Sequence, residues 1–222
     1  MNIQKTVQQL YSKRVFWYQL FISALGYTRG VRVYLKKNCT LTAGMKILDA
    51  GCGTGLITKS LHTIAHNQSL QNITFHAFDL TPSMLKPFLL WKEKQGAENI
   101  FIRQADILEP KTIPTGWQDY DLIIVSGMLE YLPKQRVTTS AKLLYNLLKP
   151  NGTFLIFLSK KNWLSHLVIE RLWHADTYTK QEITTLLKQA GITNISFKSF
   201  SPLYTYLSTQ MFIIEIKKSG NK

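Results

Sequence analysis

Three glycines at alternate positions, Gly51, Gly53 and Gly55, constrain this chain more than any other feature of its sequence. They follow an apolar stretch that ends in Asp49, and the run 56–64 after them is typical of a helix. A chain that passes from a strand into a helix through glycines lets a ligand lie close to its backbone. The third glycine comes one residue too early for the dinucleotide fingerprint G-x-G-x-x-G. The carboxylate before the turn also favours a ligand with positive charge over a pyrophosphate.

This segment resembles the first motif of the class I S-adenosylmethionine-dependent methyltransferases. S-adenosylmethionine carries an ammonium and a sulfonium group, which agrees with the carboxylate before the turn. The resemblance extends over about residues 45–217 and implies an α/β fold of the Rossmann-like, doubly wound type. Its mostly parallel sheet has seven strands, and the last one, expected at 210–217, is antiparallel. The resemblance implies that four residues of the turn bind the cofactor: Asp49, Gly51, Cys52 and Gly53.

Two later strands are predicted to end in an acid. Asp79 closes the predicted strand 72–79, where an acid can accept hydrogen bonds from both ribose hydroxyls of a nucleotide. The alternative for Asp79 is a charge at the start of the next helix, which stabilises that helix by at most about 1 kcal/mol. The resemblance places the second acid, Asp106, near the adenine amino group. Further adenine contacts are expected from Leu80, Met84 and Ile107.

The stretch after the fourth predicted strand restricts the chemistry. An apolar run that ends at Ser126 is typical of a central parallel strand, and Ser126 is expected at the cofactor. Enzymes that methylate adenine amines or glutamine side chains usually carry an Asn/Asp-Pro-Pro-aromatic tetrad here, and this chain has 126–129 Ser-Gly-Met-Leu instead. Cytosine-C5 enzymes need a nucleophilic cysteine, and neither Cys39 nor Cys52 suits that role. The remaining resemblance is to small-molecule methyltransferases that act on quinones, lipids and natural products.

Candidate catalytic residues lie in two places. Small-molecule relatives often have a histidine pair where Glu130 and Tyr131 stand, and both side chains are expected to face the transferred methyl group. The predicted insert 159–174 contains His166 and His174, whose neutral imidazoles can accept a proton near pH 7. The alternative for either histidine is a purely structural role, which is more common. No cluster of histidine, cysteine and carboxylate side chains has metal-ligand spacing, so no metal is expected.

Length, cysteine content and charge define the overall organisation. A chain of 222 residues suits one structural unit, with an N-terminal helical cap at 1–44 and a cofactor-binding domain at 45–222. Two cysteines and no membrane-length apolar run favour a cytoplasmic protein. The net charge of +14 indicates acidic partners, and no acid precedes Asp49 although eight lysines and arginines do. The aromatic, basic N-terminal region is therefore interpreted as a packed cap, or as an interfacial helix for peripheral binding to an anionic membrane.

The sequence thus predicts methyl transfer from S-adenosylmethionine, with S-adenosylhomocysteine as product, to a small hydrophobic or aromatic acceptor. The acceptor atom (oxygen, nitrogen or carbon), the use of a base and the oligomeric state stay open. One alternative is an RNA methyltransferase, which the charge favours and the missing tetrad disfavours. The other is a cofactor-binding partner protein without catalytic activity. Only the unusual pair Glu130-Tyr131 favours this alternative.

Overall fold

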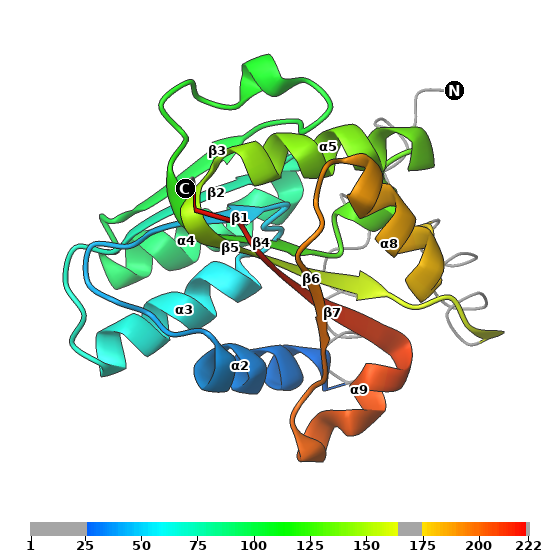
Figure 1. Ribbon diagram of the computed structural model, residues 1–222. Helices are drawn as coiled ribbons and strands as arrows, with labels where there is room; N and C mark the ends of the chain where they lie inside the picture. Colours follow the sequence, from blue (N-terminus) through cyan, green and yellow to red (C-terminus); the bar gives the residue numbers. More distant parts are fainter. Residues whose placement is uncertain (1–25, 164–174, 221–222) are drawn as a thin grey trace. The chain divides into compact units, whose positions relative to one another are not determined.

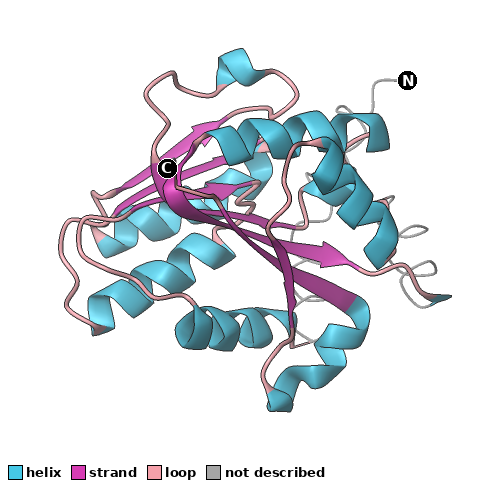
Figure 2. Cartoon of the chain, in the orientation of Figure 1, coloured by secondary structure: helices cyan, strands magenta, loops and turns pink. Residues whose placement is uncertain are grey.

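The computed structural model describes residues 26–163 and 175–220, and contacts divide the chain into two compact units, 1–113 and 114–222. Figure 1 labels the helices and strands, and Figure 2 separates helices, strands and loops by colour. The greater part of the predicted N-terminal cap 1–44, namely residues 1–25, lies outside the described residues. The same holds for His166 and His174, so their predicted roles stay predictions.

The first unit alternates helices and parallel strands. Its elements are α2 (Tyr27–Asn38), β1 (Lys46–Ala50), α3 (Leu56–Asn67), β2 (Thr74–Asp79), α4 (Pro82–Gln95), β3 (Ile100–Gln104) and η1 (Pro110–Thr112). The strands lie in the order β3-β2-β1, with Phe75 of β2 aligned to Ile47 on one side and to Ile100 on the other. All three of these side chains are at most 1% exposed, as expected for strands of a covered parallel sheet. Parallel strands end at the same edge, so the residues after β1 and β2 come close together.

The second unit contains four strands. Its elements are β4 (Tyr120–Ser126), η2 (Leu129–Tyr131), α5 (Lys134–Asn146), β5 (Leu148–Ser159), α8 (Lys180–Gln189), β6 (Ile195–Lys198), η4 (Pro202–Tyr204), α9 (Thr205–Gln210) and β7 (Met211–Lys217). The strands lie in the order β4-β5-β7-β6; β4 and β5 are parallel, and β7 is antiparallel to both of its neighbours. With the first unit, this gives the predicted mostly parallel, seven-stranded sheet with an antiparallel last strand. The predicted fold class is confirmed.

Within the described ranges 26–163 and 175–220, the structure contains neither a membrane-spanning helix nor a metal-binding cluster. No helix in these ranges combines the length and the apolar sequence needed to cross a bilayer. No group of histidine, cysteine, aspartate and glutamate side chains in these ranges is arranged to hold a metal ion. Both cysteines have free thiols; Cys52 is buried and Cys39 is partly exposed.

The start of α8 is fixed by a reciprocal capping box. The backbone N–H of Glu182 donates to Thr179 Oγ1 (3.1 Å), and the backbone N–H of Thr179 donates to Glu182 Oε2 (2.7 Å). These two bonds satisfy donors that a helix start otherwise leaves without partners. The three-residue spacing of Thr179 and Glu182 is typical of this motif.

Thr179→Ala is expected to lower the free energy of unfolding by about 1 kcal/mol, because alanine cannot accept the Glu182 N–H bond. In a protein of this size the midpoint of thermal unfolding should fall by roughly 2–4 °C. Thr185→Ala is the matched control, since Thr185 is exposed within the same helix, where alanine favours helix formation. Equal melting temperatures for the parent and Thr179→Ala would contradict a stabilising role for the cap.

Candidate functional site

The glycine turn between β1 and α3 is held in place by backbone hydrogen bonds. The N–H groups of Gly51 and Cys52 both donate to the carbonyl of Phe78 at 2.9 Å, and the N–H of Gly55 donates to the carbonyl of Cys52 at 2.8 Å. Phe78 lies in β2, so the turn is anchored to the neighbouring strand. The predicted cofactor residue Cys52 is buried here, and burial raises the pKa of its thiol well above the ordinary value.

Two glycines of the turn differ in what surrounds them. Both have left-handed backbone conformations, with φ of 52° at Gly53 and 84° at Gly55. A Cβ added at Gly53 would lie 3.1 Å from the terminal methyl of Met84, a flexible side chain. A Cβ added at Gly55 would lie only 2.5 Å from the ring of Phe88. Gly55 is therefore required for helix packing, a role that the sequence motif did not indicate.

Asp49 lies behind the turn and is 1% exposed. Its Oδ2 accepts hydrogen bonds from the backbone N–H (3.1 Å) and the hydroxyl (2.7 Å) of Thr58, in the first turn of α3. Its Oδ1 is buried and has no hydrogen-bond partner in the described structure. Burial, opposed by the two bonds from Thr58, raises the pKa of this carboxyl to about 7. A buried acceptor without a donor fits a positively charged group of a ligand that contributes the missing partner.

Asp79 connects the turn to the start of α4. Its Oδ2 accepts the backbone N–H of Gly53 (2.9 Å), and its Oδ1 accepts the backbone N–H of Thr81 (2.8 Å). Burial raises the pKa of the carboxyl, and these hydrogen bonds oppose the rise. The Thr81 side chain also donates a hydrogen bond to this carboxylate. A carboxylate has about four acceptor sites, so about one of them stays available for a hydroxyl of a ligand. The two interpretations of Asp79 made from the sequence are therefore compatible, because it both supports the helix start and can bind a ribose.

The other predicted cofactor residues of the first unit lie near Asp79. The backbone N–H of Ala105 donates to the carbonyl of Asp79 at 3.1 Å, so the strand end before Asp106 is held beside it. The Oδ1 of Asp106 accepts the backbone N–H of Leu108 at 2.8 Å. Asp106, Ile107 and Met84 are each at most 8% exposed, whereas Leu80 is partly exposed. The structure thus brings the predicted residues Asp49, Gly51, Cys52, Gly53, Asp79, Leu80, Met84, Asp106 and Ile107 to one edge of the first unit.

In the second unit, the side chain and the backbone of Glu130 hold two segments of the chain together. It is 5% exposed, and its Oε1 accepts the backbone N–H of Ser159, the last residue of β5, at 2.6 Å. Its own carbonyl accepts the backbone N–H of Asp176 at 2.7 Å. Burial raises the pKa of the carboxyl to about 7, against the opposing effect of the bonds from Ser159. Glu130 therefore holds both ends of the stretch 160–175, a role that the sequence did not indicate.

Ser126 and Tyr131, the other predicted residues that the structure describes in the second unit, are partly exposed. Ser126 ends β4, and Tyr131 ends η2, directly after Glu130. Tyr178, which the sequence did not single out, is fully buried. Its carbonyl accepts the backbone N–H of Lys161 at 2.8 Å. Its hydroxyl has no hydrogen-bond partner in the described structure. Burial, with a smaller effect from Asp176, Glu130 and Glu182, raises its pKa, so the hydroxyl stays protonated.

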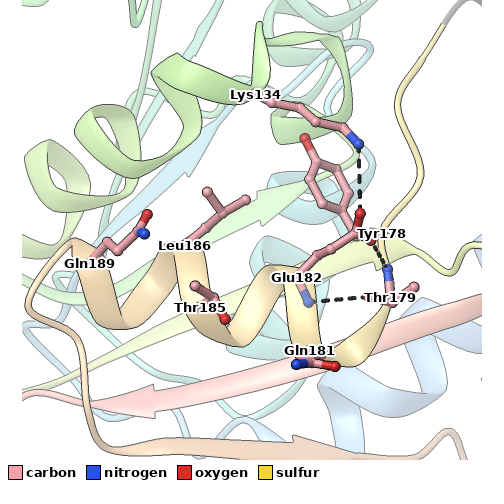
Figure 3. A pocket seen from close by; sticks show the side chains of 8 residues that line it. All are labelled: Lys134, Tyr178, Thr179, Gln181, Glu182, Thr185, Leu186 and Gln189. Carbon is pink, nitrogen blue, oxygen red and sulfur yellow. Dashed lines mark hydrogen bonds and ion pairs between the residues drawn. The ribbon is translucent and has the colours of Figure 1, made fainter.

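A shallow cavity of about 370 Å³ lies at the start of α8. Figure 3 shows the eight side chains that line it: Lys134, Tyr178, Thr179, Gln181, Glu182, Thr185, Leu186 and Gln189. Its charged groups are already paired, because Lys134 Nζ lies 3.9 Å from Glu182 Oε1 and Glu182 also belongs to the capping box. None of the predicted cofactor residues lines this cavity.

Three residues around the predicted site, Thr58, Ser159 and Tyr178, were not predicted from the sequence, because their contacts join separate parts of the chain. Thr58 holds Asp49 across nine residues, and Ser159 meets Glu130 across 29 residues. A local signal existed only for Thr58, which occupies the third position of a helix that follows an acid-ended strand. Nothing in the sequence near Ser159 or Tyr178 indicated a partner.

Comparisons with known proteins agree with this geometry. Residues 41–191 match a family model described as a methyltransferase domain. A malonyl-[acyl-carrier protein] O-methyltransferase from Paenibacillus sp. (strain JDR-2) is 27% identical over 188 residues, which are 79% of this chain and 65% of the relative. A ubiquinone biosynthesis O-methyltransferase from Xylella fastidiosa (strain M23) is 30% identical over 125 residues, 55% of this chain and 45% of the relative. The chain therefore spans less than two thirds of the length of either relative.

Solved structures share the fold at low sequence identity. The magnesium protoporphyrin IX methyltransferase from Synechocystis PCC 6803, solved with bound S-adenosylmethionine, has a TM-score of 0.69 and 15% identity. That similarity covers 99% of this chain and 98% of the other. A phosphoethanolamine N-methyltransferase from Haemonchus contortus, in complex with S-adenosylmethionine, has a TM-score of 0.72 and 14% identity over 99% of this chain and 60% of the other.

Proposed function

The chain belongs to the S-adenosylmethionine-dependent methyltransferases, and we propose from this that it transfers a methyl group to an oxygen atom of a small, hydrophobic or aromatic acceptor. The family match includes every predicted cofactor residue from Asp49 to Ser126. Solved members of the family bind S-adenosylmethionine or S-adenosylhomocysteine, as the sequence predicted for the cofactor. Oxygen is favoured as acceptor because two relatives with different acceptors are both named O-methyltransferases.

The observation that carries the proposal is the pair of carboxylates around the glycine turn. Asp49 presents a buried oxygen without a partner in the described structure, and Asp79 keeps about one acceptor site beside the backbone of Gly53. These groups fit a ligand that has both a cationic part and a ribose. When bound, S-adenosylmethionine supplies a methyl group on a positively charged sulfur. The chain's own part is to orient the two reactants in line, which can supply most of the acceleration.

On the acceptor side Glu130 is proposed as a positioning residue. Its buried Oε1 already accepts the Ser159 N–H. This contact favours a role in holding the end of β5 over a role in direct proton transfer. Tyr131, which is partly exposed, stays a predicted residue of the acceptor site. His166 and His174, outside the described residues, stay predicted bases for an acceptor that must lose a proton.

The proposal is tested by transfer of a radiolabelled methyl group to three acceptor classes: phenols, carboxylic acids and amines. The proposal expects the product to be an ether or an ester and the amines to stay unlabelled. Methylated amines as the sole products would contradict the oxygen acceptor while leaving the family unchanged. Label recovered only in RNA would instead support the RNA methyltransferase alternative.

Asp79→Ala is expected to weaken the binding of S-adenosylmethionine by about 1–3 kcal/mol, because ligand hydroxyls would lose their acceptor. Isothermal calorimetry measures this change in the dissociation constant, and circular dichroism checks that the fold is kept. Glu98→Ala is the matched control, since Glu98 is an exposed acid of the same unit outside the turn. An unchanged dissociation constant for Asp79→Ala would leave Asp79 with only its role at the start of α4.

A further inference from the structure

Three helices of the first unit form one layer. Helix α2 packs against α3, and Figure 1 shows the two running next to each other. Helix α3 meets α4 through the ammonium of Lys59, which lies 5.5 Å from the ring centroid of Phe88 and 5.4 Å from that of Trp91. The rings of His62 and Trp91 add an edge-to-face contact at 5.7 Å. The helices α2, α3 and α4 are called the helical layer below.

The helical layer is strongly cationic. Its sequences contain eight lysines and arginines and a single acid, Glu93. On α2 the cations Arg29, Arg32 and Lys36 follow one another at i, i+3 and i+7, so they share the face opposite the buried Val31 and Leu35. All three are exposed, and within the described part of the chain none of them pairs with an acid. The positive charge of this face is therefore not neutralised by its own unit.

Apolar side chains project from the same layer. Leu90 on α4 is 57% exposed and Leu89 is 41% exposed, although α4 buries other residues against the sheet. Leu90 lies four residues from Lys86 on one side and four from Lys94 on the other, so the three side chains form one stripe along the helix. Exposed leucines flanked by lysines are typical of helices that lie at a membrane interface.

We propose that the helical layer is a docking surface for an anionic lipid bilayer. The cations of α2 would meet the lipid headgroups, and Leu90 would enter the boundary between headgroups and acyl chains. An acidic nucleic acid would use the cations but offers no apolar phase for exposed leucines, so the bilayer is the partner that both features fit. The proposed surface is made of residues of α2 and α4, and the proposal does not depend on methyl transfer.

The test is sedimentation of the full chain with phosphatidylcholine vesicles, with and without phosphatidylglycerol. The triple substitution Arg29→Gln, Arg32→Gln and Lys36→Gln should weaken binding to the anionic vesicles at least about tenfold, because each cation near the surface contributes up to about fivefold and salt screens part of it. Leu90→Ser should weaken it by about tenfold through lost apolar burial. The matched control removes the same charge outside the helical layer: Lys111→Gln, Lys142→Gln and Lys188→Gln, all of which replace exposed residues.

Each outcome decides the proposal. Selective loss in the α2 triple variant, with less than about a twofold change in the control, supports it, because residues 1–25 are intact in both. Equal losses in the two triple variants would show that net charge and not this face determines binding. Absence of parent protein from the anionic vesicle pellet at low salt would overturn the proposal. So would steeply salt-dependent binding to RNA without vesicle binding.

Discussion

Gly55→Ala is expected to lower the free energy of unfolding by about 2–5 kcal/mol. A left-handed backbone costs a residue with a Cβ roughly 1–2 kcal/mol, and overpacking of a core adds about 1–3 kcal/mol. Both effects apply here, because φ is 84° and the new Cβ would lie 2.5 Å from the ring of Phe88. Phe88 is fully buried, so its ring cannot move into solvent without a loss of packing. Urea unfolding of the parent and the variant measures the difference.

Gly44→Ala separates the two causes. Gly44 also has a left-handed conformation, with φ of 78°, but an added Cβ there meets nothing within 4 Å. The control should therefore show the backbone cost alone, and the difference between the two variants is the effect of the contact with Phe88. Equal destabilisation by both substitutions would show that the contact with Phe88 adds nothing to the cost of a Cβ at Gly55.

Glu130→Gln is expected to change how stability depends on pH. The fold raises the pKa of Glu130 from 4.5 to about 7, so the folded state holds a proton that the unfolded state releases between these values. Stability should therefore decrease as pH rises through this range, by up to about 3 kcal/mol for this group. Glutamine removes the titration and can still accept the Ser159 N–H, so the slope of the unfolding free energy against pH should become shallower between about pH 4.5 and 7.

Denaturant unfolding at several pH values measures this slope. A residual slope is expected in the variant, because burial also raises the pKa of Asp49 to about 7. Glu130→Ala is the control: it removes both the charge and the acceptor, so it should destabilise the protein at every pH by leaving the Ser159 N–H without a partner. Identical slopes for the parent and Glu130→Gln would mean that Glu130 does not retain its proton in the fold.

The sequence predicted the elements whose signals are local. The glycine turn and the strand that ends in Asp79 both follow from residue types at short spacing. The fold class and the antiparallel final strand followed from the resemblance that these motifs carry. These signals persist because strand ends, turns and helix starts each require particular residues at particular positions.

What the sequence could not predict depends on contacts between distant segments. The resemblance assigned Gly53 to the cofactor and gave Gly55 no separate role, and only the approach of Phe88 from α4 shows what Gly55 does. The sequence also did not indicate that the carboxylate of Glu130 accepts the N–H of Ser159 at the end of β5, 29 residues away. The exposed leucines of α4 were equally unforeseen, since their exposure depends on which face the helix presents to the sheet.

Because Glu130 holds both ends of the stretch 160–175, it also affects how the length of this stretch can change among relatives. The stretch 160–175 departs beside Ser159 and returns at Asp176, and Glu130 binds both points. With the ends fixed, a change in the length of such a segment alters the closure entropy only logarithmically, by about 0.6 kcal/mol for a doubling. Insertions and deletions between these two points can therefore accumulate without disturbing the sheet. The carboxylates around the glycine turn lie elsewhere in the chain, so length changes between Ser159 and Asp176 leave them in place.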